Sequence, residues 1–209
     1  MKAFIFDLDG VLVFTDRYHY EAWKKLADRL GIYFDETINN RLRGVSRMES
    51  LEIILERSDV SYSDKEKEAF AAEKNETYRE LLSHMRPEDV SEDVRDTLRR
   101  LRERGHRMAI GSSSKNTKYI LERVGLTDMF DAISDGTNIT HSKPDPEVFL
   151  KAAEYLGERA DNCIVVEDAY SGIDAAKAAG MTAVGIGDAA FYDRADVTIT
   201  ALCDIIDLF

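Results

Sequence analysis

The segment from Phe4 to Gly10 carries the residues best suited to chemistry. A short apolar run ends there in two carboxylates, Asp7 and Asp9, which a glycine follows. Side chains two positions apart leave a strand on the same face, and the chain turns directly afterwards, so we expect the two carboxylates to converge. Converging carboxylates repel each other unless a divalent cation lies between them, and ligation by oxygen alone favours Mg²⁺. The alternative is a strand that ends in solvated acidic residues.

Three later segments supply the other groups that phosphate chemistry requires. Ser112 opens a run of small hydroxyl residues before a helix, where free backbone N–H groups and side-chain donors form a phosphate cradle. Lys143 offers a cation, and the acidic pair Glu167 and Asp168 offers further ligands for Mg²⁺. Each segment alone has a plain alternative, namely N-capping, a solvated lysine or solvated loop acids. Their coincidence at successive strand ends favours phosphoryl transfer with Asp7 as the nucleophile.

An alternation of strands and helices from about residue 106 onward predicts how these segments are brought together. Repeated β-α-β units of this length are typical of an α/β fold, a doubly wound parallel sheet with helices on both faces. Ligands of such folds bind beyond the carboxyl ends of the strands, where all four segments lie. We expect strands at 3–6, 107–111, 132–134, 163–166 and 182–186, and helices through 119–124, from Pro146 (capped by Asp145) to about 156, and at 171–179.

The stretch between the first strand and about residue 85 breaks this alternation. It contains no convincing strand but three or four amphipathic helices, one of them from about 17 to 30. Two others begin with the capping boxes Ser46–Glu49 and Ser63–Glu66. An all-helical insertion directly after the first strand predicts a cap over the end of that strand. We therefore expect a core of residues 1–14 and 87–209 and a helical cap of residues 15–86.

Composition restricts the class of partner. The chain of 209 residues is 44% hydrophobic and 33% charged, which is ordinary for a globular protein. Its net charge of −12 argues against a nucleic-acid or anionic-membrane surface, and no apolar run approaches the roughly 18 residues of a membrane helix. The chain starts directly in a strand, without a signal-peptide pattern. Cys163 and Cys203 are expected as small buried thiols, which indicates a reducing, cytoplasmic setting.

Together the four motifs, F-D-L-D-G, S-S, K-P and E-D, resemble the haloacid dehalogenase-like phosphatase superfamily over the whole chain. Within it, the stretches 18–24, 42–47 and 112–116 are similar to the phosphoglucomutases that interconvert β-glucose 1-phosphate and glucose 6-phosphate. The resemblance implies that Asp7 becomes an aspartyl phosphate and that Asp9 is the general acid/base for the sugar hydroxyl. It also implies small sugar phosphates as partners, glucose 1,6-bisphosphate as activator and phosphoryl donor, and a monomer. The implied metal ligands for Mg²⁺ are Asp7, Asp9 through its backbone carbonyl, Glu167 and Asp168, and the implied phosphate donors are Ser112 and Lys143.

The same resemblance implies that cap residues bind the substrate. His19 and Trp23 lie one helical turn apart, where packing is the alternative to a role at the sugar or in orienting Asp9. Lys74 interrupts an apolar face, with a snorkelling lysine as the alternative. Arg43 stands where the similar phosphomutases have lysine, which keeps the charge but changes the reach and donor geometry. Further implied substrate contacts are Gly44, Val45, Ser46, Ser50, Ser113, Ser114 and Asn116, and Thr15 is the implied hinge.

Arg47 carries the distinction between the candidate functions. It lies in the first turn of a helix capped by Ser46, where a cation is unfavourable to the helix dipole. A charge placed against its local preference suggests an anionic partner, the phosphate that is not being transferred. A phosphomutase needs that grip because it must exclude water and present a second sugar hydroxyl. The alternatives are a phosphatase of sugar phosphates or similar small esters, which admits water, and a non-catalytic phosphate-binding protein, which would need no nucleophile.

Overall fold

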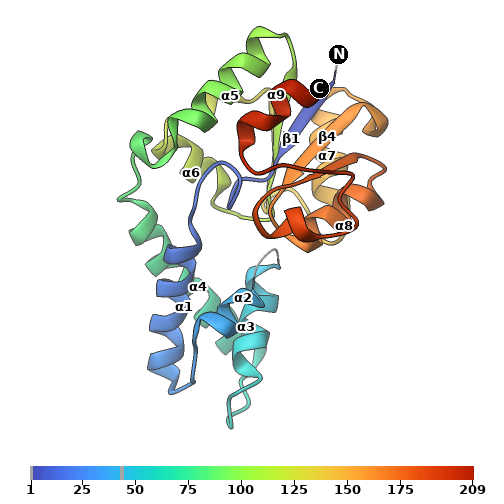
Figure 1. The fold of residues 1–209 in the computed structure, drawn as a ribbon. Helices are drawn as coiled ribbons and strands as arrows, with labels where there is room; N and C mark the ends of the chain where they lie inside the picture. Colours follow the sequence, from blue (N-terminus) through green and yellow to red (C-terminus); the bar gives the residue numbers. More distant parts are fainter. Residues whose placement is uncertain (1, 43–44) are drawn as a thin grey trace.

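A computed structural model of the protein describes residues 2–42 and 45–209, and its core is a six-stranded parallel sheet (Figure 1). The strand order is β3-β2-β1-β4-β5-β6, and every neighbouring pair is parallel. This arrangement confirms the predicted α/β class. The strands are β1 (Ala3–Phe6), β2 (Arg107–Gly111), β3 (Ala132–Ser134), β4 (Cys163–Glu167), β5 (Thr182–Gly185) and β6 (Val197–Thr198).

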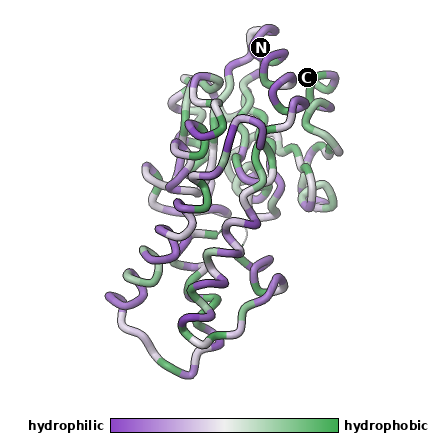
Figure 2. The backbone as a smooth tube through the Cα atoms, turned by 90° about the vertical axis from the view of Figure 1, so that its left-hand side faces the viewer, coloured by the Kyte–Doolittle hydropathy of each residue, from purple (hydrophilic) through white to green (hydrophobic). Residues whose placement is uncertain are grey.

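Helices cover both faces of the sheet, because consecutive strand residues point to opposite sides. Phe4 and Phe6 of β1 pack on the face covered by α5, α6 and α9, whereas Ile5 packs on the face covered by α7 and α8. The central strand β1 is therefore buried along its whole length, and the hydrophobic residues of the core concentrate in the sheet (Figure 2). These helices are α5 (Glu92–Glu103), α6 (Thr117–Arg123), α7 (Glu147–Leu156), α8 (Tyr170–Ala178) and α9 (Ile205–Leu208).

Four helices follow β1 and lie together beyond the end of the sheet (Figure 1). They are α1 (Asp16–Leu30), α2 (Glu36–Asn40), α3 (Arg47–Leu55) and α4 (Asp64–Leu82), and they have an apolar core of their own around Trp23 and Leu51. Both predicted capping boxes are present, at the starts of α3 and α4. Among the described residues, no helix is both long enough and apolar enough to cross a membrane. The boundaries of the core and cap remain a prediction.

Local deviations from the predicted elements have simple causes. Pro146 is the N-cap of α7 rather than its first residue, and the carboxylate of Asp145 accepts a hydrogen bond from the Glu147 backbone N–H (2.9 Å). The strand β6 was not predicted, because two residues carry no periodicity. Cys163 is buried as predicted, whereas Cys203 is half-buried and lies in a short 3₁₀ turn just before α9.

Candidate active site

The turn after β1 brings Asp7 against the end of β4. The backbone N–H of Asp7 continues the sheet by donating to the carbonyl of Val166 (3.0 Å), and the chain then bends through Gly10, which has a φ of 82°. A Cβ atom on Gly10 would lie 2.1 Å from a carboxylate oxygen of Asp168. Only glycine therefore allows the loop to pass over Asp168 while adopting this backbone conformation. The two acidic segments predicted from different strands are adjacent for this reason.

Lys143 is buried between two carboxylates. Its Nζ atom lies 2.5 Å from Asp7 Oδ1 and also donates to Glu167 Oε1, and only 4% of the residue is exposed. The alternative of a solvated lysine is therefore wrong. The second oxygen of Glu167 accepts from the backbone N–H of Ala169 (2.8 Å), so both of its oxygens have partners. A Cβ atom on Gly172 of α8 would lie 1.9 Å from the Glu167 carboxyl, so this glycine leaves the space that the carboxylate fills.

Burial dominates the electrostatics at this end. It raises the pKa of Asp7 to about 8, against the opposing effect of Lys143, and the charge of Glu167 raises it further. Burial and then the charge of Glu167 raise the pKa of Asp168 to about 9. For Lys143, burial lowers the pKa, but the carboxylates outweigh it and hold the value above that of an ordinary lysine. Asp7 and Glu167 share the ammonium of Lys143, and Asp168 lies beside them, so the three carboxyl groups carry an excess of negative charge when all are ionised.

This excess fits a divalent cation. Carboxylate oxygens of Asp7, Glu167 and Asp168 can lie within 4.8 Å of one another, and all three are hard oxygen donors of the kind that Mg²⁺ prefers. A cation there would also lower the raised pKa values of Asp7 and Asp168. The chemistry of the donor set therefore agrees with the predicted Mg²⁺ site. The assignment of individual ligands remains a prediction.

The hydroxyl loop after β2 supplies donors toward the same space. Ser112 is buried, and its Oγ accepts from the backbone N–H of Ser114 (3.2 Å), which leaves its own proton to donate. The Oγ of Ser113 is buried without a hydrogen-bond partner among the described residues. Gly136 lets the next loop pack closely, since a Cβ there would lie 2.4 Å from the carbonyl oxygen of Ser113. An orphaned hydroxyl in a polar cavity is what a phosphate oxygen would satisfy.

Thr15 connects the catalytic loop to the cap. It occupies the N-cap position of α1, but its hydroxyl donates to Asp9 Oδ1 instead of capping the helix. Burial raises the pKa of Asp9 to about 6, while this hydrogen bond lowers it. The hydroxyl of this buried threonine bonds to Asp9 of the core although the residue begins a cap helix, which is consistent with the predicted junction between core and cap. Its function as a hinge remains a prediction.

A buried lysine organises the cap side of the cavity. The Nζ atom of Lys74 lies 2.9 Å from His19 Nδ1 and 4.6 Å from the ring centroids of both Trp23 and Tyr78. Only 3% of Lys74 is exposed, so the snorkelling alternative is wrong. Burial first, and then the charges of Lys74 and Arg47, lower the pKa of His19. His19 is therefore a neutral imidazole at pH 7.

Arg47 is held by a neutral partner. Its guanidinium donates to Asn75 Oδ1 (2.8 Å), and burial lowers its pKa. The same Asn75 oxygen accepts from Asn116 Nδ2 (2.9 Å), and Arg79 donates to Asn116 Oδ1 (3.2 Å). Sequence reasoning missed Asn75 and Arg79. One signal was available, since asparagine in the middle of a helix as long as α4 is a poor helix former.

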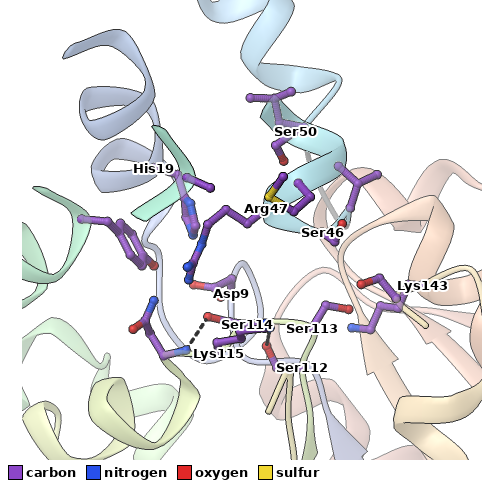
Figure 3. A pocket seen from close by; sticks show the side chains of 18 of the residues that line it. Asp9, His19, Ser46, Arg47, Ser50, Ser112, Ser113, Ser114, Lys115 and Lys143 are labelled. Carbon is purple, nitrogen blue, oxygen red and sulfur yellow. Dashed lines mark hydrogen bonds between the residues drawn. The ribbon is translucent and has the colours of Figure 1, made fainter. Parts of the chain in front are cut away.

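One cavity of about 500 Å³ is lined by Asp7 and Lys143 at the sheet and by Arg47 and Lys74 from the cap, whereas Asn75 and Arg79 do not line it. In Figure 3, Arg47 reaches down from α3 toward Asp9, the serines of the hydroxyl loop lie below Asp9, and Lys143 lies to the right. Arg43 and Gly44 lie outside the described residues, and Thr15 does not line the cavity. The predicted site residues that do line it are Asp7, Asp9, His19, Trp23, Val45, Ser46, Arg47, Ser50, Lys74, Ser112, Ser113, Ser114, Asn116, Lys143, Glu167 and Asp168.

Comparison with known proteins agrees with this geometry. Residues 1–180 match the haloacid dehalogenase-like hydrolase family. The chain is 41% identical to a β-phosphoglucomutase of Bacillus subtilis over 98% of its own length and 92% of that protein. It superposes on the crystal structure of a β-phosphoglucomutase from Clostridium difficile with a TM-score of 0.92 and 39% identity, covering 98% of this chain and 93% of that one. A fructose-1-phosphate phosphatase of Escherichia coli is 33% identical over 87% of this chain and 94% of its own.

Proposed function

Because this chain belongs to the haloacid dehalogenase-like hydrolase family, we propose that it is a phosphomutase that interconverts β-D-glucose 1-phosphate and glucose 6-phosphate. The reaction passes through an aspartyl phosphate on Asp7 and through glucose 1,6-bisphosphate. One observation carries the proposal: a single cavity holds phosphate-binding groups both beside Asp7 and at Arg47 of the cap. Similarity to β-phosphoglucomutases supports the same choice.

The first transfer uses the buried end of the cavity. A carboxylate oxygen of Asp7 attacks the phosphorus, and the bond from phosphorus to the sugar oxygen breaks. Lys143, 2.5 Å from Asp7, orients the nucleophile and spreads the charge of the loose transition state. The hydroxyl groups of Ser112 and Ser113 donate hydrogen bonds to phosphate oxygens.

Proton transfer falls to Asp9, which lies two residues beyond the nucleophile. Its carboxyl gives a proton to the departing sugar oxygen and, in the second half-reaction, takes the proton of the attacking sugar hydroxyl. The hydrogen bond from Thr15 fixes one oxygen of Asp9, which leaves the other to face the sugar. The neutral His19 beside Lys74 is placed to contact the same sugar.

Asp7, Asp168, Glu167 and the backbone carbonyl of Asp9 would hold Mg²⁺. When bound, the cation neutralises charge on the phosphoryl group and on the surrounding carboxylates. Glu167 also has a role that does not depend on the metal, because it accepts a second hydrogen bond from Lys143 and so fixes that side chain beside Asp7.

The second transfer demands that a sugar hydroxyl, and not water, reach the aspartyl phosphate. A bisphosphate can turn around only if the cavity grips its other phosphate in both orientations. Arg47 and Asn116 supply that grip from the cap and the core. Residues 15–86, as the cap, would close over a substrate that carries this distal phosphate and exclude water.

A phosphatase of sugar phosphates is the second candidate. It would use the same Asp7 and Asp9, and the similarity to a fructose-1-phosphate phosphatase supports it. The two functions differ in what accepts the phosphoryl group from Asp7. A phosphatase releases free phosphate at every turnover, whereas a phosphomutase conserves it.

One assay separates the candidates. β-Glucose 1-phosphate is supplied with and without catalytic glucose 1,6-bisphosphate, glucose 6-phosphate is detected with its dehydrogenase, and free phosphate is measured in parallel. A phosphomutase gives glucose 6-phosphate in large excess over free phosphate and is stimulated by the bisphosphate. Stoichiometric release of phosphate, without glucose 6-phosphate, would refute the proposal in favour of the phosphatase.

A further inference from the structure

Arg79 is a cap cation whose side chain contacts residues of the core. It lies in the last turn of α4, and its guanidinium carbon lies 4.3 Å from the ring centroid of Tyr119 on α6. Its NH1 atom donates to Asn116 Oδ1 (3.2 Å). None of the ion pairs found within residues 2–42 and 45–209 includes Arg79. An aromatic face and a neutral amide therefore hold this charge.

Asn116 is turned away from its ordinary local role. It occupies the N-cap position of α6, where an asparagine side chain normally accepts from the first turn, yet it makes no side-chain capping bond. Its buried amide reaches α4 instead, where Oδ1 accepts from Arg79 and Nδ2 donates to Asn75 (2.9 Å). Asn116 therefore leaves the start of α6 without a side-chain cap, and its amide is held in one orientation by contacts with α4.

That orientation has a consequence for the cavity. Because Arg79 occupies Oδ1, the amide of Asn116 presents its Nδ2 donor to Asn75, to which the guanidinium of Arg47 also donates. Both donors meet at the Oδ1 atom of Asn75, 2.8 and 2.9 Å away. A phosphate oxygen that took the place of Asn75 Oδ1 would be bound by the same two donors.

We propose that Arg79 is a positioning residue for the distal phosphate, acting through Asn116 and anchored on Tyr119. By holding Oδ1, it fixes the amide so that Nδ2 and Arg47 bind the same anionic group, while it ties the cap helix α4 to the core. This inference rests on the proposed function, in which a second phosphate lies at the cap end. Arg79 itself does not touch the substrate.

A double-mutant cycle tests this coupling by binding rather than by turnover. Glucose 1,6-bisphosphate is titrated calorimetrically into Asp7→Asn protein carrying Arg79→Ala, Asn116→Ala or both. We expect Arg79→Ala to weaken binding roughly three- to tenfold, the size of one modest hydrogen bond. The double variant should bind no more weakly than Asn116→Ala alone, since Arg79 acts through that amide. Additive losses would overturn the inference, because they would mean a general charge effect.

Three further measurements sharpen the result. Inorganic phosphate, which has no distal group, should bind all variants within about twofold of the parent, and equal losses for both ligands would overturn the inference. Arg79→Met retains the aliphatic stem on α4 if the alanine variant is unstable, and it should show the same coupling. Arg99→Ala on α5 removes a matched exposed charge and should leave bisphosphate binding unchanged.

The outcome for Arg79 is separable from the outcome for the proposed function. Mutase turnover of the unmodified protein is measured independently, and binding to the Asp7→Asn protein requires no turnover. A protein that hydrolyses sugar phosphates without isomerising them, yet displays the non-additive cycle, would refute the mutase and support the role of Arg79. A bisphosphate that does not bind would overturn both.

Discussion

At the sheet end of the cavity a buried ammonium contacts two carboxylates, whereas at the cap end cations are held by neutral and aromatic groups. Lys143 lies between Asp7 and Glu167. In the cap, by contrast, Lys74 lies against two rings and a neutral imidazole, and Arg47 donates to an asparagine. A buried cation that contacts no anion is costly, so such a group implies that an anionic ligand binds beside it. The sheet end carries charge for chemistry, and the cap end carries charge for recognition.

This difference between the two ends predicts which substitutions should affect which substrate. Changes at Asp7, Lys143 or Glu167 should impair every phosphoryl donor alike, because each must react with Asp7. Changes at the cap end should impair only substrates with a second anionic group. Acetyl phosphate, which has one phosphate and a small leaving group, is the probe that separates the two ends.

The largest effect is expected for Asp7→Asn. The amide keeps the shape of the carboxylate but is not a nucleophile, so turnover should fall by at least about 10³-fold for sugar phosphates and acetyl phosphate alike. Coupled assays of both substrates measure the loss, and circular dichroism checks that the fold is retained. Residual turnover near that of the parent protein would refute the aspartyl-phosphate mechanism.

Removal of divalent cations should come next. Chelation should lower turnover by about 10²-fold or more, and added Mg²⁺ should restore it, because the single ammonium of Lys143 cannot balance the three neighbouring carboxylates. The measurement is turnover after dialysis against a chelator, followed by titration with Mg²⁺. Full activity in the dialysed protein would contradict the predicted metal site.

Asp9→Asn should separate phosphoryl transfer that needs a proton donor from transfer that does not. Sugar transfer should fall by about 10²- to 10⁴-fold, the usual contribution of a positioned proton donor. Phosphorylation of Asp7 by acetyl phosphate should persist, because acetate leaves without a proton. Rapid-quench measurement of both reactions provides the test, and equal losses would mean that Asp9 serves only the metal.

The contrast between the two ends also explains how far the sequence could predict the site. Asp7, Lys143 and Asp168 were predictable because each follows a strand, and parallel strands bring their carboxyl ends to one edge of a sheet. Neither Asn75 nor Arg79 follows a strand. Their role depends on how α4 lies against the core, and beyond the mid-helix asparagine no local feature of the sequence indicates that packing.

The fold divides in the same way. Capping boxes and glycine stops predicted most helices, and apolar runs predicted five strands, because these features are local. The two-residue β6 has too little sequence to carry a pattern, and Gly172 has the sequence context of an ordinary helix residue although it accommodates Glu167. Close approaches of this kind arise only once the chain is packed.

Arg47→Ala should act on one class of substrate. Loss of a charge-assisted contact costs about 1.5–3 kcal/mol, so mutase turnover should fall roughly 10- to 150-fold, with little change for acetyl phosphate. Arg29→Ala is the matched control, because it removes another cap arginine whose partner, Glu73, is exposed. Its effect on turnover should be negligible. Equal losses on both substrates in Arg47→Ala would mean that the residue supports the cap fold.

The smallest expected effect is that of Gly172→Ala, and it tests the sheet end without removing a functional group. The new Cβ would lie 1.9 Å from the Glu167 carboxyl, so Glu167 must shift and Lys143 must follow it. Overpacking of this kind costs about 1–3 kcal/mol of stability, and the misplaced lysine should slow turnover about five- to tenfold. The loss should be the same for the sugar phosphate and for acetyl phosphate, since both need Lys143 beside Asp7.

Ser171→Ala is the control for any change at the start of α8. The Ser171 hydroxyl is buried without a hydrogen-bond partner among the described residues, so its removal should leave both activities intact. Urea denaturation of the two variants separates the stability loss from the catalytic one, because turnover is compared under conditions where each protein is folded. If Gly172→Ala instead slowed only the substrate with a distal phosphate, the division would fail. Glu167 and Lys143 would then contribute to recognition as well as to chemistry. The effect of a change at the sheet end would depend on whether the substrate carries a second phosphate.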